Sequence, residues 1–107
     1  TEDAERILSE ALKIEQAGAQ MLIVECIPTA LAQRISEALT IPVIGIGAGV
    51  HCDGQVLVVY DMLGISLGRL PKFTKDYMQQ AGSILGAIQS YVTEVKNSQF
   101  PAQEHSF

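Results

Sequence analysis

The chain is organised around short, almost uninterrupted apolar segments that alternate with helical stripes. Segment 19–24 (AQMLIV) is largely apolar and stops abruptly at Glu25, and segment 41–46 (IPVIGI) is a second run of the same kind. Apolar runs of strand length without polar alternation are typical of strands buried on both faces, as in parallel sheets. This pattern constrains the fold more than any other feature, and it predicts an α/β architecture with a parallel sheet.

Helical periodicity flanks both runs. A stripe at helical spacing before the first run predicts a helix that Gly18 closes, and a second stripe predicts a helix over about 29–39, begun by the fixed φ of Pro28. The first stripe consists of Ala4, Ile7, Leu8, Ala11 and Leu12, and the second of Leu31, Ile35, Ala38 and Leu39.

Residues 54–60 are rich in β-branched side chains and predict a third strand, followed by a turn at 61–64. A helix capped by Asp53 and ended by Gly64 is the alternative. Only residues 47–53 separate the second strand from the third, whereas a parallel crossover ordinarily takes about a dozen residues or more. Either this connection is degenerate or one strand assignment is wrong.

The last periodic segment predicts one long amphipathic helix over 74–96, followed by a tail, 97–107, without periodicity. Within this helix Gly82 and Gly86 would each cost roughly 1 kcal/mol relative to Ala. Its apolar stripe consists of Tyr77, Ala81, Ile84, Ile88, Tyr91 and Val95. Three strands with unpaired edges make a poor sheet alone, so the chain is expected to be part of a larger fold.

Composition excludes several classes. The chain is 48% hydrophobic and 18% charged, as in a globular core, and no apolar run reaches the roughly 20 residues of a membrane span. The net charge is −5 and the basic residues are scattered singly, which argues against a nucleic-acid surface. Two cysteines without a second pair indicate a reduced compartment. Because the chain starts at Thr1 rather than Met, a targeting segment could precede it.

Glu25 is the first candidate for chemistry. Catalytic side chains of (β/α)8 barrels lie at the C-terminal ends of strands, and Glu25 directly follows a buried-type run. Burial at that boundary would raise the pKa of a carboxylate toward the range of a general base. The alternative is that Glu25 only interacts with the N-terminal dipole of the helix that begins near Pro28.

Other polar residues are weaker candidates. The glycine cluster 45–49 lacks the Lys-Ser/Thr of a nucleotide-binding loop and is expected to allow a sharp turn and a close backbone approach. His51, Cys52 and Asp53 are contiguous, which is poor geometry for three ligands of one metal, and a polar loop at a barrel mouth is the default interpretation. Asp61 follows the predicted third strand, and capping of the next turn is its expected role.

Taken in order and at their spacing, several segments resemble the ketopantoate hydroxymethyltransferase family. The segments are 22–28 (LIVECIP), 41–49 (IPVIGIGAG), 52–58 (CDGQVLV), 61–64 (DMLG), 71–73 (PKF) and 100–107 (FPAQEHSF). The resemblance departs at Val50-His51 and at Arg69-Leu70. It covers essentially the whole chain, which is more specific than any single motif.

The resemblance implies that residues 1–107 are the C-terminal portion of a single (β/α)8 TIM barrel of the phosphoenolpyruvate/pyruvate type, incomplete in this chain. It further implies a transferase that moves a hydroxymethyl group from 5,10-methylenetetrahydrofolate to 3-methyl-2-oxobutanoate, giving 2-dehydropantoate in pantothenate biosynthesis. The family's catalytic base corresponds to Glu25. It would remove the C3 proton of the oxo acid, and Mg2+, whose ligands are expected in an N-terminal portion rather than here, would stabilise the resulting enolate.

The resemblance assigns no folate-contacting residue to this chain. It implies a cytoplasmic homo-oligomer whose partners are small-molecule substrates and the N-terminal portion of the same barrel, without nucleic acid or membrane. Two other hypotheses stay open. One is a non-catalytic fragment that self-associates through its strand edges, and the other is a different enolate-forming barrel enzyme of the phosphoenolpyruvate type.

Overall fold

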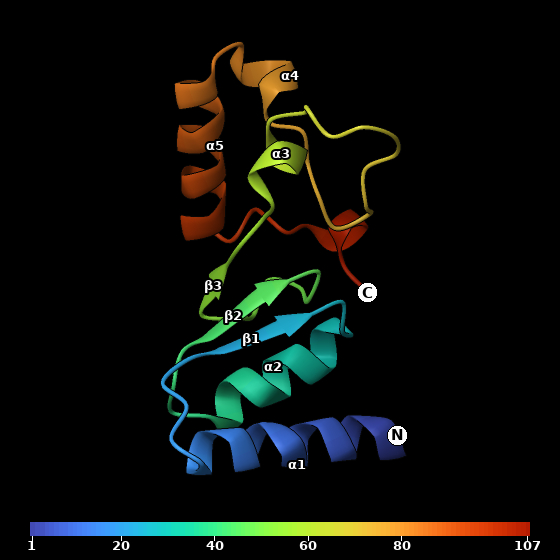
Figure 1. Ribbon diagram of the computed structural model, residues 1–107, viewed down its shortest axis with the longest axis vertical. Coiled ribbons are helices and arrows are strands. Elements are labelled where there is room, and N and C mark those ends of the chain that lie inside the picture. Colours follow the sequence, from blue (N-terminus) through green and yellow to red (C-terminus); the bar gives the residue numbers. More distant parts are fainter.

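Two lobes succeed one another along the chain in the computed structural model, which describes residues 1–107 (Figure 1). The first lobe, residues 1–55, carries the sheet and two helices, and the second, residues 56–107, is helical. Each lobe has its own cluster of buried apolar side chains. The molecule is therefore elongated, with extents of 44 × 24 × 22 Å.

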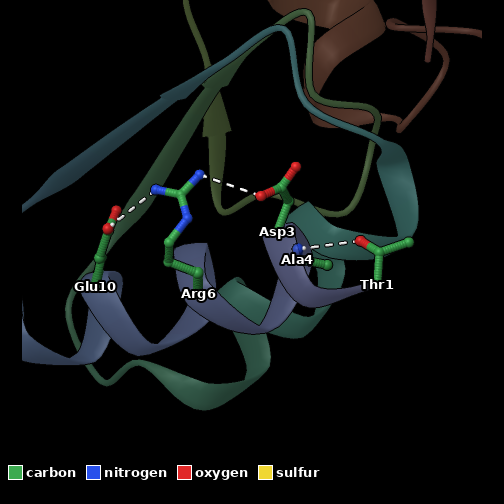
Figure 2. Close-up of polar contacts among 5 residues, drawn as sticks. All are labelled: Thr1, Asp3, Ala4, Arg6 and Glu10. Carbon is green, nitrogen blue, oxygen red and sulfur yellow. Dashed lines mark hydrogen bonds and ion pairs between the residues drawn. The ribbon is translucent and has the colours of Figure 1, made fainter.

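The first predicted helix is confirmed as α1, Glu2–Gln16. The hydroxyl of Thr1 accepts the amide hydrogen of Ala4 and so caps an otherwise unpaired N–H group. Gly18, at φ 105°, then turns the chain toward the sheet. Figure 2 shows the polar contacts of the first turns, which join Thr1 to Ala4 and Arg6 to both Asp3 and Glu10. Exposed pairs of this kind contribute only about 0.2–0.5 kcal/mol each.

The sheet is parallel, as predicted, with the strand order β1-β2-β3. Its strands are β1, Leu22–Glu25, β2, Val43–Ile46, and β3, Gly54–Gln55. Helix α2, Thr29–Ala38, connects the first two strands and confirms the second predicted helix. The connection from β2 to β3 contains no helix, so it is degenerate, as its short length required.

Helices α1 and α2 lie together on one side of the sheet (Figure 1). Their apolar stripes and one face of β1 and β2 form the first core, in which Ile35 and Val43 are fully buried. Glu15 ties α1 to the approach of β2, because its carboxylate accepts hydrogen bonds from the amides of Thr40 and Ile41 at 2.7 and 3.1 Å. These bonds hold the pKa of Glu15 below its ordinary value.

The prediction that the first apolar run is buried on both faces is wrong. Burial alternates along β1: Val24 is buried, whereas Ile23 is 60% exposed and Glu25 is exposed. Side chains alternate between the two faces of a strand, and the helices cover only the face of Val24. The opposite face of β1 carries Ile23 and Glu25.

The strand predicted over 54–60 is wrong for most of its length. Pairing with β2 ends at Gln55, and Val59–Met62 form the short helix α3. The alternative helix is correct about its end, because Gly64 adopts φ 71°, but it begins after Val58 rather than at Asp53. The amide of Val56 still donates to the carbonyl of Gly45 at 3.0 Å, but the register with β2 goes no further than Gln55, so the β propensity of residues 56–60 does not produce a longer strand.

The helix predicted over 74–96 is two helices, α4, Met78–Ala81, and α5, Ile84–Lys96. Gly82 adopts the left-handed φ of 71° between them, and the hydroxyl of Ser83 accepts the amide hydrogen of Gly86 to cap α5. The tail is ordered by a 3-10 turn, Gln103–His105. The second core consists of Met62, Tyr77, Ala87 and Phe100.

The α/β class and the parallel sheet are confirmed, whereas these residues alone do not close a barrel. No helix is both long enough and apolar enough to cross a membrane.

Candidate active site

Glu25 is the last residue of β1, at the C-terminal edge of the parallel sheet. In the sheet register it lies beside Ile46, the last residue of β2. Residues paired in a parallel ladder point to the same face, so both side chains lie on the face that α1 and α2 leave uncovered. The position predicted for Glu25, at the end of a strand, is therefore the position observed, but its side chain is exposed rather than buried.

The chain turns sharply after Glu25. Cys26 adopts a left-handed φ of 52°, and its amide donates to the carbonyl of Ile46 at 2.9 Å. This bond continues the ladder one residue beyond the strand, so the backbone on both sides of Glu25 is held by β2. The amide of Thr29, the first of α2, donates to the carbonyl of Phe107. That N–H group is thus bonded to Phe107 and not to the Glu25 carboxylate.

The glycine cluster forms the sharp turn that was predicted. Gly47 and Gly49 adopt φ of 66° and 82°, which favour glycine. A Cβ on Gly47 would lie 3.0 Å from the ring of Phe73, and one on Gly49 would lie 2.6 Å from the side chain of Thr29. The bare backbone therefore lets two other segments approach the end of β2.

Sequence reasoning missed the segment that reaches this edge from the second lobe. Phe73 packs on Gly47, and the ammonium of its neighbour Lys72 lies 5.0 Å from the ring centroid of Phe107. Neither residue belongs to a helix or strand, so periodicity gave no signal for them. The only sequence signal was their presence in the segments that carried the family resemblance.

The loop 51–53 does not lie wholly at the C-terminal edge of the sheet, which corrects the interpretation of a polar loop at the barrel mouth. The carboxylate of Asp53 accepts from the amide of Val43 at 2.8 Å, at the opposite end of β2 from Ile46. Cys52 is half-buried against Gly45, and burial raises the pKa of its thiol. His51 is exposed.

Asp61 lies in α3 rather than at a strand end, because the third strand stops at Gln55. Its carboxylate accepts a hydrogen bond from the hydroxyl of Ser66, which holds the following turn. This contact supports the turn through a side chain, but no backbone N–H group donates to the Asp61 carboxylate, so the expected cap is not observed.

These residues do not fit a magnesium site. Mg2+ requires several oxygen ligands in near-octahedral geometry, and no group of three or more His, Cys, Asp or Glu side chains is close enough to share an ion. The three candidate carboxylates lie apart: Glu25 ends β1, Asp53 is bonded at the start of β2, and Asp61 belongs to α3.

A polar cluster in the second lobe holds elements of that lobe together. The carboxylate of Glu94 accepts from the hydroxyl of Tyr77 at 2.8 Å and pairs with the ammonium of Lys75 at 3.1 Å. Burial, with the adjacent carboxylate, raises the pKa of Tyr77 well above its ordinary value. Tyr77 therefore stays a neutral hydrogen-bond donor, and the cluster fastens α5 to the segment before α4.

Comparison with known proteins agrees with the resemblance seen in the sequence. Residues 1–103 match the sequence profile of the family described as ketopantoate hydroxymethyltransferase. Proteins named 3-methyl-2-oxobutanoate hydroxymethyltransferase are 58% identical in Shewanella frigidimarina, over 106 residues, and 58% identical in Shewanella sediminis, over 107 residues. The matches cover 99% and 100% of this chain. The chain spans 40% of the length of each relative.

Proposed function

Because the chain belongs to the ketopantoate hydroxymethyltransferase family, we propose that the protein carrying it transfers a hydroxymethyl group from 5,10-methylenetetrahydrofolate to 3-methyl-2-oxobutanoate. The product would be 2-dehydropantoate, a step of pantothenate biosynthesis. The observation that carries this proposal is the place of Glu25 at the C-terminal end of a parallel strand, on the face that α1 and α2 leave free.

In this proposal the Glu25 carboxylate removes the proton on C3 of the oxo acid. The electron pair of the C–H bond then forms the C2–C3 double bond of an enolate. The methylene carbon of the folate next forms a bond to C3 of the enolate and a bond to a water oxygen, while its two C–N bonds break. The two nitrogens take up the proton held by Glu25 and one proton of that water, and tetrahydrofolate leaves. Positioned general bases of this kind contribute about 10²–10⁴-fold in rate. The backbone bonds on both sides of Glu25 support such positioning.

The Mg2+ that the family resemblance implies has no ligand set among these residues. We therefore assign to this chain the base and its supporting loops, and not the metal ligands or the folate contacts.

We also propose that residues 1–107 are the C-terminal portion of one (β/α)8 barrel. A parallel sheet with helices on one face and apolar side chains on the other supports this. In a barrel the helices form the outer ring, and side chains from all the strands pack together inside. The span of 40% of the relatives' length is consistent with it. We extend to this protein the family's setting, a cytoplasmic homo-oligomer with small-molecule substrates.

The proposal is tested by Glu25→Gln in the complete protein. Exchange of the C3 proton of 3-methyl-2-oxobutanoate in deuterated water, followed by NMR, is expected to fall at least about 100-fold. Glu37→Gln is the matched control, because Glu37 is an exposed carboxylate on α2. Unchanged exchange in Glu25→Gln would remove Glu25 from the role.

A second measurement separates this proposal from another enolate-forming barrel enzyme. The complete protein is incubated with 3-methyl-2-oxobutanoate and 5,10-methylenetetrahydrofolate, and 2-dehydropantoate is quantified. Proton exchange without any product would favour the phosphoenolpyruvate-type alternative.

A further inference from the structure

Two segments of the second lobe, residues 72–73 and the tail that ends in Phe107, reach the loops that follow β2 and β1. Phe73 packs on Gly47, Lys72 faces the ring of Phe107, and the carbonyl of Phe107 accepts two hydrogen bonds from Thr29. These bonds are 3.1 Å from the amide and 3.2 Å from the hydroxyl. Since α2 starts at Thr29, the loop 26–28 is held by β2 at one end and by Phe107 at the other.

The turn that presents Phe107 is ordered by its own contacts. Nδ1 of His105 accepts the amide hydrogen of Ala102 at 3.1 Å, and the hydroxyl of Ser106 donates to the carbonyl of Ala102 at 2.8 Å. Phe100, which precedes the turn, is 2% exposed and anchors it in the second core. Phe107 is thus delivered to α2 by a fixed segment.

We propose that Phe107 is a positioning residue for Glu25: by fixing the first residue of α2, it fixes the loop that sets where the carboxylate lies. This inference rests on the proposed function, because it concerns the geometry of the proposed base. Phe107 touches neither reacting atom and acts through Thr29. The cation–π contact with Lys72 holds the ring in place and so holds the carbonyl beside Thr29.

The test uses Phe107→Ala in the complete protein, with Phe107→Tyr as the conservative variant. Phe107→Ala is expected to speed amide hydrogen exchange in residues 26–31 about tenfold or more, since the Thr29 amide loses its fixed acceptor. It is also expected to lower kcat for C3 proton exchange about tenfold while KM stays within about twofold, because misplacement of a catalytic group reduces rate rather than binding. Phe107→Tyr is expected to restore both values.

Lys72→Met provides a milder variant should Phe107→Ala fail to fold. It removes the cation but keeps an apolar stem, and a loss of about 0.5–1 kcal/mol predicts a two- to fivefold change in the same two measurements. Leu67→Ala is the control, because Leu67 is fully exposed. It is expected to change neither measurement.

Each result decides one point. Unchanged amide exchange in Phe107→Ala would show that Phe107 does not fix the start of α2, and faster amide exchange with unchanged kcat would show a structural role only. Either result overturns the inference. Full C3 exchange activity in Glu25→Gln would instead overturn the proposed function, whatever the Phe107 variants do.

Discussion

At the scale of single residues, Asp53 provides hydrogen-bond partners for the backbone of Val43 at the start of β2. Its carboxylate accepts from the amide of Val43, and its own amide donates to the Val43 carbonyl at 2.9 Å. Val43 is fully buried, so Asp53→Ala would leave a buried N–H group without a partner. We expect a loss of about 1–3 kcal/mol in the free energy of unfolding, measured by urea titration. Asp53→Asn keeps an acceptor oxygen and is expected to retain most of the stability; equal losses in both variants would contradict this role.

His105 gives the tail a defined pH dependence. Burial lowers the pKa of its imidazole, with Lys75 acting in the same direction and Glu104 and Glu94 opposing it. The unfolded state therefore binds a proton more readily than the folded state. The contribution of neutral His105 to stability is complete above the ordinary histidine pKa of about 6.5, and it is lost as the pH falls from there toward the lowered pKa of the folded state. We expect the thermal midpoint to fall between about pH 7 and pH 5.5, and to fall less in His105→Gln. An identical fall in both proteins would contradict the assignment to His105.

The candidate residues show how far local patterns reach. Glu25 was located correctly because an abrupt end of an apolar run marks the end of a strand. Asp61 was misplaced, since its position depends on where β3 stops, and that is decided by pairing with β2 rather than by β propensity. Asp53 was misplaced because its carboxylate binds the Val43 amide, a contact that no local pattern reports. The contacts of Phe73 and Phe107 join residues far apart in the sequence, and no periodicity reports such contacts.

At the scale of elements, Gly82 separates α4 from α5, and the sign of one substitution tests the break. In a continuous helix, Gly82→Ala would stabilise the protein by about 1 kcal/mol. At the observed φ of 71° a Cβ is strained although no atom lies within 4 Å of it, so we expect a loss of about 1–2 kcal/mol in chemical unfolding. Gly18→Ala, also left-handed and in open space, should lose stability similarly. A gain in stability in Gly82→Ala would instead support the single continuous helix.

The periodicity did not reveal the break because α4 and α5 pack against the same core. Ala81 before the break, and Ala87, Tyr91 and Val95 after it, all pack in or against the second core, so the apolar spacing persists across Gly82. The sequence Gly82-Ser83 was the available signal, since a left-handed glycine followed by a serine cap ends one helix and begins the next. By contrast, α1, α2 and β2 each correspond to one apolar pattern in the sequence, and these patterns predicted them correctly.

At the scale of the whole molecule, the first lobe leaves the edges of its sheet and one apolar face without a cover. β1 is an edge strand, and Met21 and Ile23 are 56% and 60% exposed. Such an edge is a template for pairing with another chain. We therefore expect the isolated 107-residue chain to elute in size-exclusion chromatography with light scattering as species larger than its 11.5 kDa monomer.

Ile23→Lys tests whether that face causes the association, because a charge on an edge strand opposes pairing. The variant is expected to shift the chain toward monomer, whereas Leu67→Lys, at a fully exposed site in the second lobe, is not. A monodisperse monomer before any substitution would contradict the expectation. Ile23 and Glu25 point to the same face of β1, so self-association and a working site would compete for one surface. Addition of the remainder of the barrel as a separate polypeptide should then dissociate the self-associated species. Dissociation without recovery of C3 proton exchange would show that this face takes part in folding but not in the proposed chemistry.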